Sequence, residues 1–374
     1  MDKKKILIVG RTFYPELSPR SFRTTELATE LAKQGHDVTV ILPQNRQKDI
    51  ESKFDNTFGI VFIYYGPLLW KSLGKSKISW IGDWKRKLGR LLFLLFEYPN
   101  IEIYFKLPKL LKKLKGFDLM ISIAVPHENH WAIAKVRTET NPIAKVWVAD
   151  CGDPFMTNVI ETIKPPFYFG WWERLFLKKC DYVSVPTEGS VKAYNKRYIE
   201  KFVVIPQGFN FMDIQQIDVK PIYELPTFAY AGGVSYTGIR SLNNFIDLLI
   251  EKKVPFKFHI YSNNAKTVLS EKIKGIEEFV VIHDPLPRKH LLFELSKMDF
   301  LVNLDNGTPF NSPSKLIDYA LTQRPILNIN PLSPEALLVD EFLEGNYENQ
   351  KEVSNLEDFN ITNVATKFIQ LIES

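Results

Sequence analysis

The segment NSPSKLIDYALTQRPIL, which begins at Asn311, has the residue types of a phosphate site. Pro313 suits the first turn of a helix, so Ser314 and Lys315 are expected at the N-terminus of that helix. Free backbone N–H groups, a hydroxyl and an ammonium could together bind a phosphate there. Asp318 follows one turn later, where its carboxylate could accept hydrogen bonds from the two hydroxyls of a ribose. Alternatively, Asp318 is an exposed helix carboxylate that pairs with Lys315.

Two other segments place anion-binding groups just after a predicted strand. Gly232 and Gly233 form a turn in which the backbone can approach a bulky ligand and donate N–H groups to it. Near the N-terminus, Ser18, Arg20 and Arg23 lie at or near the start of a predicted helix, where guanidinium groups suit an anion such as phosphate. The alternative for this second segment is a helix cap with surface arginines.

The segment HENH contains two histidines, His127 and His130, that could share a helix face and bind a metal. It differs from the HExxH motif and no third ligand is evident, so we expect no metal site. Alternatively, His130 is a packed histidine beside Trp131. The two cysteines, Cys151 and Cys180, form no CxxC motif, which favours buried thiols in a reducing compartment.

The elements that must position these residues alternate along the chain between short apolar runs and helical segments. This order is typical of parallel sheets covered by helices on both faces. The predicted strands are Ile6–Val9, Val38–Leu42, Val61–Tyr65, Leu119–Ile123, Ala144–Val148, Tyr182–Val185, Phe202–Ile205, Phe228–Tyr230, Phe256–Tyr261, Val280–His283, Phe300–Asn303 and Ile326–Ile329. The predicted helices include Ser21–Gln34, Arg240–Glu251, Arg288–Lys297, Pro313–Leu321 and Asn363–Ile372.

A stretch rich in proline and poor in periodicity, from Pro206 to Pro226, separates two such alternations. We therefore expect two doubly wound, Rossmann-like α/β domains, 1–208 and 209–355. A C-terminal helix in 356–374 is expected to cross back to the first domain. Sheets of this kind bind ligands at the carboxyl ends of their strands, so two facing domains would have a cleft between those ends.

Length and composition describe an ordinary globular protein. The 374 residues are 45% hydrophobic and 24% charged, with a net charge of +5, which is enough for two cores and excludes long disorder. No segment approaches the roughly 20 apolar residues of a membrane span. The N-terminal apolar stretch is too short for a secretory signal, so we expect a cytoplasmic protein. The first turn has no GxGxxG, which argues against a nicotinamide cofactor.

Charge is concentrated in Trp70–Lys115, which contains twelve Lys and Arg against three Asp and Glu, interleaved with aromatic residues. Basic residues mixed with Trp and Leu suit the surface of an anionic membrane. The alternative is a solvated helix face above a buried apolar stripe. Nucleic acid is a less suitable partner, because no motif for binding DNA or RNA accompanies the charge.

The ordered set of motifs resembles the GT-B-fold glycosyltransferases of family 4. The matching pieces cover nearly the whole chain and are FYPELSPRSFRTTELATELAKQGHDVTVI, SIAVPHENHWAIA, VWVADCGDPF, VIPQGF, YAGGVSYTGIRSL and SPSKLIDYALTQRPIL. The resemblance implies a nucleotide-diphosphate-sugar donor in the C-terminal domain and an acceptor in the N-terminal domain. It also implies retention at the anomeric carbon, no cofactor and no obligatory metal.

Together with the motifs described above, the resemblance implies a role for each candidate site residue. Residues expected to act in catalysis are His130, Lys315 and Arg240. Those expected to bind the donor are Arg20, Gly232, Gly233, Pro285, Leu286, Ser312, Pro313, Ser314 and Asp318. Those expected to bind the acceptor are Arg23, His127, Asp150 and Asp153.

Some positions depart from the family pattern. Phe310 stands where the family often has Glu, and Val234 and Thr237 replace the usual Arg and Lys after the glycine turn. We expect a transferase that adds a sugar to a saccharide or lipid-linked acceptor in cell-surface polysaccharide synthesis. Two alternatives stay open, a nucleotide-sugar epimerase on the same fold and a non-catalytic subunit that only binds the donor.

Overall fold

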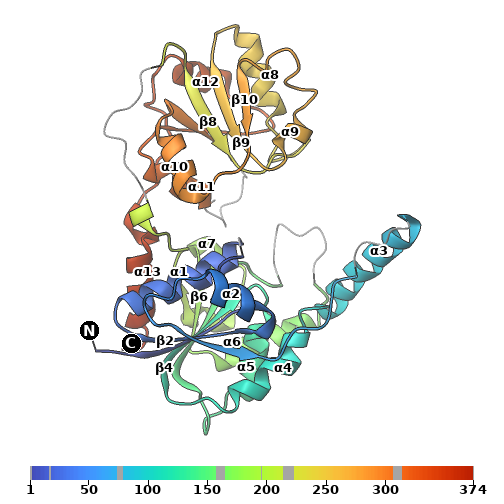
Figure 1. The fold of residues 1–374 in the computed structure, drawn as a ribbon, viewed down its shortest axis with the longest axis vertical. Helices are drawn as coiled ribbons and strands as arrows, with labels where there is room; N and C mark the ends of the chain where they lie inside the picture. Colours follow the sequence, from blue (N-terminus) through green and yellow to red (C-terminus); the bar gives the residue numbers. More distant parts are fainter. Residues whose placement is uncertain are drawn as a thin grey trace. The chain divides into compact units, whose positions relative to one another are not determined.

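The computed structural model describes residues 2–16, 18–73, 79–156, 165–194, 196–213, 223–305 and 314–373. The chain forms two compact units, each built on a parallel β-sheet with helices against it (Figure 1). Unit 1 comprises Met1–Phe209 and Asp358–Ser374, and unit 2 comprises Asn210–Glu357. The predicted fold class, two doubly wound α/β domains, is confirmed.

The sheet of unit 1 has seven strands in the order β3-β2-β1-β4-β5-β6-β7, and all neighbouring pairs are parallel. The strand order reverses between β1 and β4, so a crevice is expected beyond the carboxyl ends of these two strands. The strands are β1 (Lys5–Val9), β2 (Asp37–Pro43), β3 (Val61–Tyr65), β4 (Phe117–Ala124), β5 (Ala144–Cys151), β6 (Tyr182–Val185) and β7 (Phe202–Val204).

Helices cover both faces of this sheet because successive strand residues point to opposite sides. Ile6 and Ile8 of β1 pack on one side, and Leu7 and Val9 pack on the other. The first side is covered by α1 (Pro19–Lys33) and α13 (Ile361–Gln370), and the second by α4 (Glu102–Leu111), α5 (Glu128–Val136) and α6 (Phe169–Lys179). The other helices of unit 1 are α2 (Gln47–Lys53), α3 (Ser79–Phe96) and α7 (Glu188–Val191).

The C-terminal helix α13 belongs to unit 1 although it follows unit 2 in the sequence. Phe209 forms a parallel bridge with Asn360, just before the helix begins. Helix α13 lies beside α1 (Figure 1), and its Val364 and Phe368 are buried in the same core as Leu27 of α1. The packing of its apolar face therefore holds the two ends of the chain in one core.

The sheet of unit 2 has five parallel strands in the order β10-β9-β8-β11-β12. Its order reverses between β8 and β11. The strands are β8 (Thr227–Ala231), β9 (Lys257–Tyr261), β10 (Val280–His283), β11 (Phe300–Leu304) and β12 (Ile326–Ile329). The helices are α8 (Asn243–Lys252), α9 (Ala265–Val268), α10 (Arg288–Ser296), α11 (Ser314–Leu321) and α12 (Ala336–Leu343).

Helix α3 extends away from the layers of unit 1 (Figure 1). It leaves large apolar side chains in solvent, with Trp84 exposed by 63%, Phe96 by 57% and Leu91 by 50%. No described helix is both long and apolar enough to cross a membrane. The basic segment predicted from the sequence thus contains an exposed amphipathic helix.

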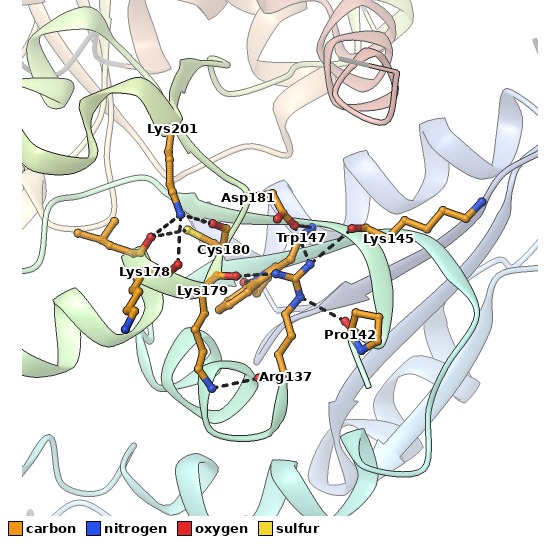
Figure 2. Close-up of polar contacts among 11 residues, drawn as sticks. Arg137, Pro142, Lys145, Trp147, Lys178, Lys179, Cys180, Asp181 and Lys201 are labelled. Atoms are coloured by element: carbon orange, nitrogen blue, oxygen red, sulfur yellow. Dashed lines mark hydrogen bonds and ion pairs between the residues drawn. The ribbon is translucent and has the colours of Figure 1, made fainter. Parts of the chain in front are cut away.

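Basic side chains fasten the C-terminal ends of α5 and α6 (Figure 2). Arg137 follows α5, pairs with Asp181 at 2.7 Å and donates a hydrogen bond to the carbonyl of Lys179. Lys201 donates from Nζ to three carbonyls at the end of α6, those of Leu177, Lys178 and Cys180. Terminal helix carbonyls lack partners within the helix, so these cations stabilise the helix ends.

Replacement of Arg137 by Met should lower the free energy of unfolding of unit 1 by about 2–3 kcal/mol, because a partly buried ion pair and a charge-assisted hydrogen bond to a partly buried carbonyl are lost. All seven tryptophans lie between residues 70 and 172, so tryptophan fluorescence in urea reports on unit 1. Lys145→Met is the control, since the Lys145–Asp118 pair involves a lysine side chain that is 75% exposed. Equal destabilisation by both variants would contradict the role of Arg137.

Candidate functional site

The turn after β8 in unit 2 brings Gly232 against the ammonium of Lys315. Gly232 has a φ of +148°, and a Cβ added there would lie 1.8 Å from Lys315 Nζ. The backbone conformation therefore favours glycine, and a side chain at this position would displace the lysine ammonium. Gly233 has open space around it and no such conformation. Because β8 and α11 flank the reversal of strand order, this contact lies where open α/β sheets bind ligands.

Lys315 is held in a partly apolar environment. Its Nζ donates a hydrogen bond to the hydroxyl of Tyr230 at 3.1 Å and lies 4.6 Å from the centre of that ring. The Tyr230 hydroxyl in turn donates to the carbonyl of Gly233 at 2.9 Å. Burial, together with the nearby charge of Arg240, lowers the pKa of Lys315 to about 8. None of the described carboxylates pairs with this ammonium.

Asp318 pairs with Arg288 and not with Lys315, so the alternative of a Lys315 pair is wrong. Arg288 Nε lies 3.0 Å and Nη2 2.8 Å from the same oxygen of Asp318. Arg288 Nη1 also donates to the carbonyl of Asn210 at 3.2 Å. This pairing could not be predicted from the sequence, because Arg288 is thirty residues away and begins a different helix. It orients the carboxylate that we expected to bind a ribose.

The remaining donor residues of unit 2 lie at the same edge of the sheet or outside the described residues. Pro285 and Leu286 follow β10 and are exposed. Just before them, the ring of His283 stacks on Tyr261 at 4.6 Å. Ser312 and Pro313, like Phe310, lie outside the described residues, and for Ser314 only its place as the first residue of α11 is described.

In unit 1, Arg23 and Asp150 form a buried pair. The guanidinium donates to both carboxylate oxygens, at 3.1 Å and 2.8 Å, and also to the carbonyl of Pro206 at 2.8 Å. Ser184 donates a further hydrogen bond to Asp150 at 2.7 Å. Both charged side chains are nearly inaccessible to solvent. The pair links α1 to β5 and β6, and its hydrogen-bonding groups are occupied within the unit, which leaves it poorly placed to contact an acceptor.

Arg20 and Asp153 form a second pair that remains accessible. Arg20 Nη2 lies 2.9 Å from an oxygen of Asp153, and 20% and 36% of the two side chains are exposed. The guanidinium crosses Gly152, where an added Cβ would lie 1.9 Å from it. The absence of a side chain at Gly152 thus sets the position of Arg20. This pair lies at the carboxyl end of β5, near the reversal of strand order.

The two histidines of unit 1 have different environments. Around His130, Nδ1 is 2.7 Å from the Ser122 hydroxyl and Nε2 is 3.4 Å from the sulfur of Cys151. This residue is fully buried, and burial lowers its pKa to about 3. Both ring nitrogens of His130 therefore have protein partners. The position of His130 is that of a histidine packed in the core, which was the alternative to a role in catalysis.

His127 lies immediately before α5, and its Nδ1 has no hydrogen-bond partner among the described residues. Burial, with His130 and Arg20 nearby, lowers its pKa well below the usual value, although a backbone hydrogen bond with Asp153 opposes the shift. The ring is consequently neutral and has an unused nitrogen. The structure favours His127 over His130 for contact with a bound ligand.

Cys151 is a third ligand-type side chain that the sequence did not indicate. His127, His130 and Cys151 offer ligand atoms within 4.8 Å of one another, all buried. Among the described residues this is the only such group of three or more. A set of nitrogen and sulfur atoms suits zinc or copper rather than the Mg²⁺ that accompanies phosphates. Burial raises the pKa of the Cys151 thiol well above its usual value, so the thiol form is favoured.

Glu128, which follows His127, was also missed. It is fully buried, and neither carboxyl oxygen has a hydrogen-bond partner among the described residues. Burial and the neighbouring Glu97 raise its pKa well above the usual value, while Arg11 opposes the shift. The sequence shows a glutamate beside the two histidines, but its burial could not be predicted from the sequence.

Comparison with known proteins gives a sequence match over most of unit 1 and structural matches over the whole chain. Residues 22–211, about half of the chain, match the sequence model of glycosyltransferase family 4. No curated protein matches the sequence. A glycosyltransferase from Rickettsia africae ESF-5 has a similar structure, with a TM-score of 0.64 and 13% identity over 99% of this chain and 98% of that one.

Two further solved structures are similar over nearly their whole length. The apo form of the lipopolysaccharide outer core galactosyltransferase WaaB has a TM-score of 0.59 and 11% identity, and the alignment covers 99% of both chains. UGT89C1 of Arabidopsis thaliana, complexed with UDP-L-rhamnose, has a TM-score of 0.54 and 10% identity over 100% of this chain and 96% of that one. At these identities the similarity shows a common fold.

Acidification should destabilise unit 1 through His130. Below pH 6.5 the unfolded state binds a proton that the native His130, with its pKa of about 3, does not accept. The free energy of unfolding should then fall by up to about 1.4 kcal/mol per pH unit for this residue. The measurement is urea unfolding between pH 7 and 4 for the wild type and His130→Gln. Parallel pH curves for the two proteins would exclude this contribution.

The two glycines of the β8 turn provide a matched test. Gly232→Ala should displace the Lys315 side chain and weaken binding of nucleoside diphosphates at least tenfold, measured by calorimetry. Gly233→Ala should leave binding within about twofold, since its Cβ would meet open space. Similar losses in both variants would contradict the arrangement of Lys315 over Gly232.

Proposed function

This chain belongs to glycosyltransferase family 4, and we propose that it transfers a sugar from a nucleotide-diphosphate-sugar to a saccharide or lipid-linked acceptor. The enzyme has the GT-B fold of its structural neighbours. The proposal includes retention of the anomeric configuration and a role in cell-surface polysaccharide synthesis. Because UGT89C1 was solved with UDP-L-rhamnose, uridine diphosphate sugars are the first donors to examine.

The observation that carries the proposal is the desolvated ammonium of Lys315 above the glycine turn. Its pKa is lowered by burial and by Arg240, so the charged form is under-stabilised in the free protein. A diphosphate bound at the turn would supply the missing negative charge. Gly232, Lys315 and Arg240 would thus form a site in unit 2 that favours a polyanionic ligand.

We propose that the same cations assist the reaction. As the bond between the sugar and the diphosphate breaks, negative charge develops on the leaving phosphate oxygen. Preorganised cations and N–H groups aimed at that oxygen stabilise the transition state more than the ground state. Lys315 and Arg240 would fill this role, with the N-terminus of α11 adding backbone N–H groups. Asp318, oriented by Arg288, would bind the ribose hydroxyls.

Unit 1 is proposed to bind the acceptor and to contact the transferred sugar. His127 supports this role because it has a neutral ring and an unused nitrogen beside the Arg20–Asp153 pair. The Arg23–Asp150 pair would fix the position of α1, and so of Arg20, without touching substrate. The original assignment of His130 to catalysis remains a prediction, and its burial favours a supporting role behind His127.

We propose that no resident metal and no cofactor take part. Enzymes that rely on Mg²⁺ for diphosphate chemistry hold it with carboxylate oxygens. Within the described parts of unit 2, no group of three or more such side chains comes together. Lys315 and Arg240 would instead neutralise the leaving diphosphate.

A membrane-surface location is proposed from the basic segment 70–115. The exposed part of α3 carries Lys85, Arg86, Lys87 and Arg90, and the chain before α6 exposes Phe167. Lysine and arginine contribute about 1 kcal/mol each near anionic lipid, and aromatic rings favour the headgroup region. The protein would then act as a peripheral protein on the cytoplasmic face, where lipid-linked acceptors are accessible.

The test combines donor binding with turnover. A panel of nucleotide sugars is screened by calorimetry, and the best donor is incubated alone and with lipid-linked saccharides. Transfer to an acceptor supports the proposal. Conversion of the donor to an epimer in the absence of acceptor would favour the epimerase, and tight donor binding without any product would favour the non-catalytic subunit.

Lys315→Met should reduce turnover about 10²–10³-fold, the effect of about 2.7–4 kcal/mol typical of a lost transition-state donor. Wild-type affinity for the donor diphosphate should fall as pH rises above about 8, because the ammonium loses its proton and its positive charge. The Met variant should bind weakly at pH 7 and lack that pH dependence. An unchanged turnover in folded Lys315→Met would refute its role.

A further inference from the structure

An aromatic cavity of about 630 Å³ opens on unit 1 among α3, α4 and α6. Its lining is almost entirely apolar, and its volume is within the roughly 300–1,000 Å³ of small-molecule sites. The walls include Trp70, Leu92, Phe96, Tyr104, Phe169 and Trp172. The proposed transfer reaction does not by itself account for this cavity.

Specific contacts hold the wall of the cavity nearest α3 in place. Trp70 stacks on Tyr98 with 5.6 Å between ring centres, and the Tyr98 hydroxyl donates to the carbonyl of Lys71 at 3.0 Å. Leu73 passes so close to α3 that a Cβ added at Gly89 would lie 2.9 Å from the Leu73 carbonyl oxygen. These contacts hold the segment against the helix, so the cavity exists before any ligand binds.

The described charges at the surface of α3 and α4 around the cavity are positive. Of the described acidic side chains on or beside its helices, Glu97, Glu102 and Glu173 are all buried. Lys135 places its ammonium 4.1 Å from the centre of the Tyr104 ring in the wall. Among the described side chains of α3 and α4, the exposed charged ones are the cations Lys85, Arg86, Lys87, Arg90 and Lys109. An apolar cavity within a basic surface is complementary to a hydrocarbon chain with an anionic head.

The cavity is connected to the candidate acceptor site through packed rings. Phe169, in the cavity wall, lies 5.4 Å from Phe155, and Phe155 lies 4.9 Å from His127. Trp131 packs against both Phe155 and Phe169. A chain in the cavity is therefore separated from His127 by two packed rings, those of Phe169 and Phe155.

We propose that this cavity binds the hydrocarbon chain of the acceptor, a lipid that carries a phosphate. This inference rests on the proposed transferase function. A concave site with room for a single chain, whose Phe169 wall is joined to His127 through the ring of Phe155, fits an individual acceptor molecule better than the flat surface of a bilayer. The basic face of α3 would lie beside the phosphate of the same lipid.

Chain-length dependence of binding tests the proposal. Farnesyl phosphate and dimethylallyl phosphate share a headgroup and differ by ten carbons, and both are titrated into the whole protein. Because each buried methylene favours binding, farnesyl phosphate should bind the wild type at least tenfold more tightly. Equal affinities for the two phosphates would overturn the proposal.

Two tryptophan variants on one face of α3 localise the binding. Leu92→Trp fills the cavity and should reduce the preference for farnesyl phosphate to less than about threefold. Leu88→Trp is the matched control, because Leu88 lies one turn earlier, is also half-buried and does not line the cavity. Its preference should match that of the wild type. Equal retention of the preference in both variants would place the binding elsewhere and refute the proposal.

Other occupants give distinct results. Displacement of farnesyl phosphate by vesicles of phosphatidylglycerol would assign the cavity to bulk membrane lipid and overturn the acceptor assignment. A dimer in light scattering that only Leu92→Trp abolishes would assign it to a second copy of the chain, which also overturns it. Binding of farnesyl phosphate at the cavity without any sugar transfer would refute the transferase proposal while supporting a lipid-phosphate site.

Discussion

The ammonium of Lys315 above Gly232 is the contact on which the candidate donor site depends. A lysine in this position loses hydration and lies near the charge of Arg240, and among the described residues only the hydroxyl of Tyr230 accepts a hydrogen bond from it. Such an arrangement costs free energy in the empty protein, since a desolvated charge without a counter-ion is unfavourable. A bound diphosphate would act as the counter-ion and remove that cost, and the free energy released would contribute to the affinity for the ligand.

Unit 1 uses its charges differently. The Arg23–Asp150 pair is enclosed and satisfied by Ser184 and the carbonyl of Pro206, and so it fixes the elements around it. Removing one partner of such a pair leaves an uncompensated buried charge, which makes the pair a strong constraint on geometry. The accessible Arg20 and the unused nitrogen of His127 then lie on a rigid support. Rigid support is what a site needs to hold a sugar in one orientation.

The structure also separates the chemical part of unit 1 from its apolar part. The polar groups gather at the carboxyl ends of β1, β4 and β5, whereas the aromatic cavity lies among the helices on one face of the sheet. Packed rings from Trp131 to Phe169 fill the space between them. A lipid-linked substrate has the same division, with a polar head and an apolar chain.

The sequence alone determined the fold class and the position of every predicted strand, because buried parallel strands are short apolar runs bounded by turns. Val61–Tyr65, Tyr182–Val185, Val280–His283 and Ile326–Ile329 were predicted with the observed bounds. It also located Gly232, Gly233 and Lys315, since local motifs indicate the ends of strands and the starts of helices. These features depend on neighbours in the chain.

Only the tertiary structure decided which of these groups face a ligand. Arg23, Asp150 and His130 have the residue types of a binding site, yet their partners come from distant strands and bury them. The pairing of Arg288 with Asp318, the cysteine beside His130 and the cavity behind Phe169 likewise join segments far apart in sequence. Burial and hydrogen-bond partners are properties of packing, and the periodicity of one segment carries no information about what packs against it.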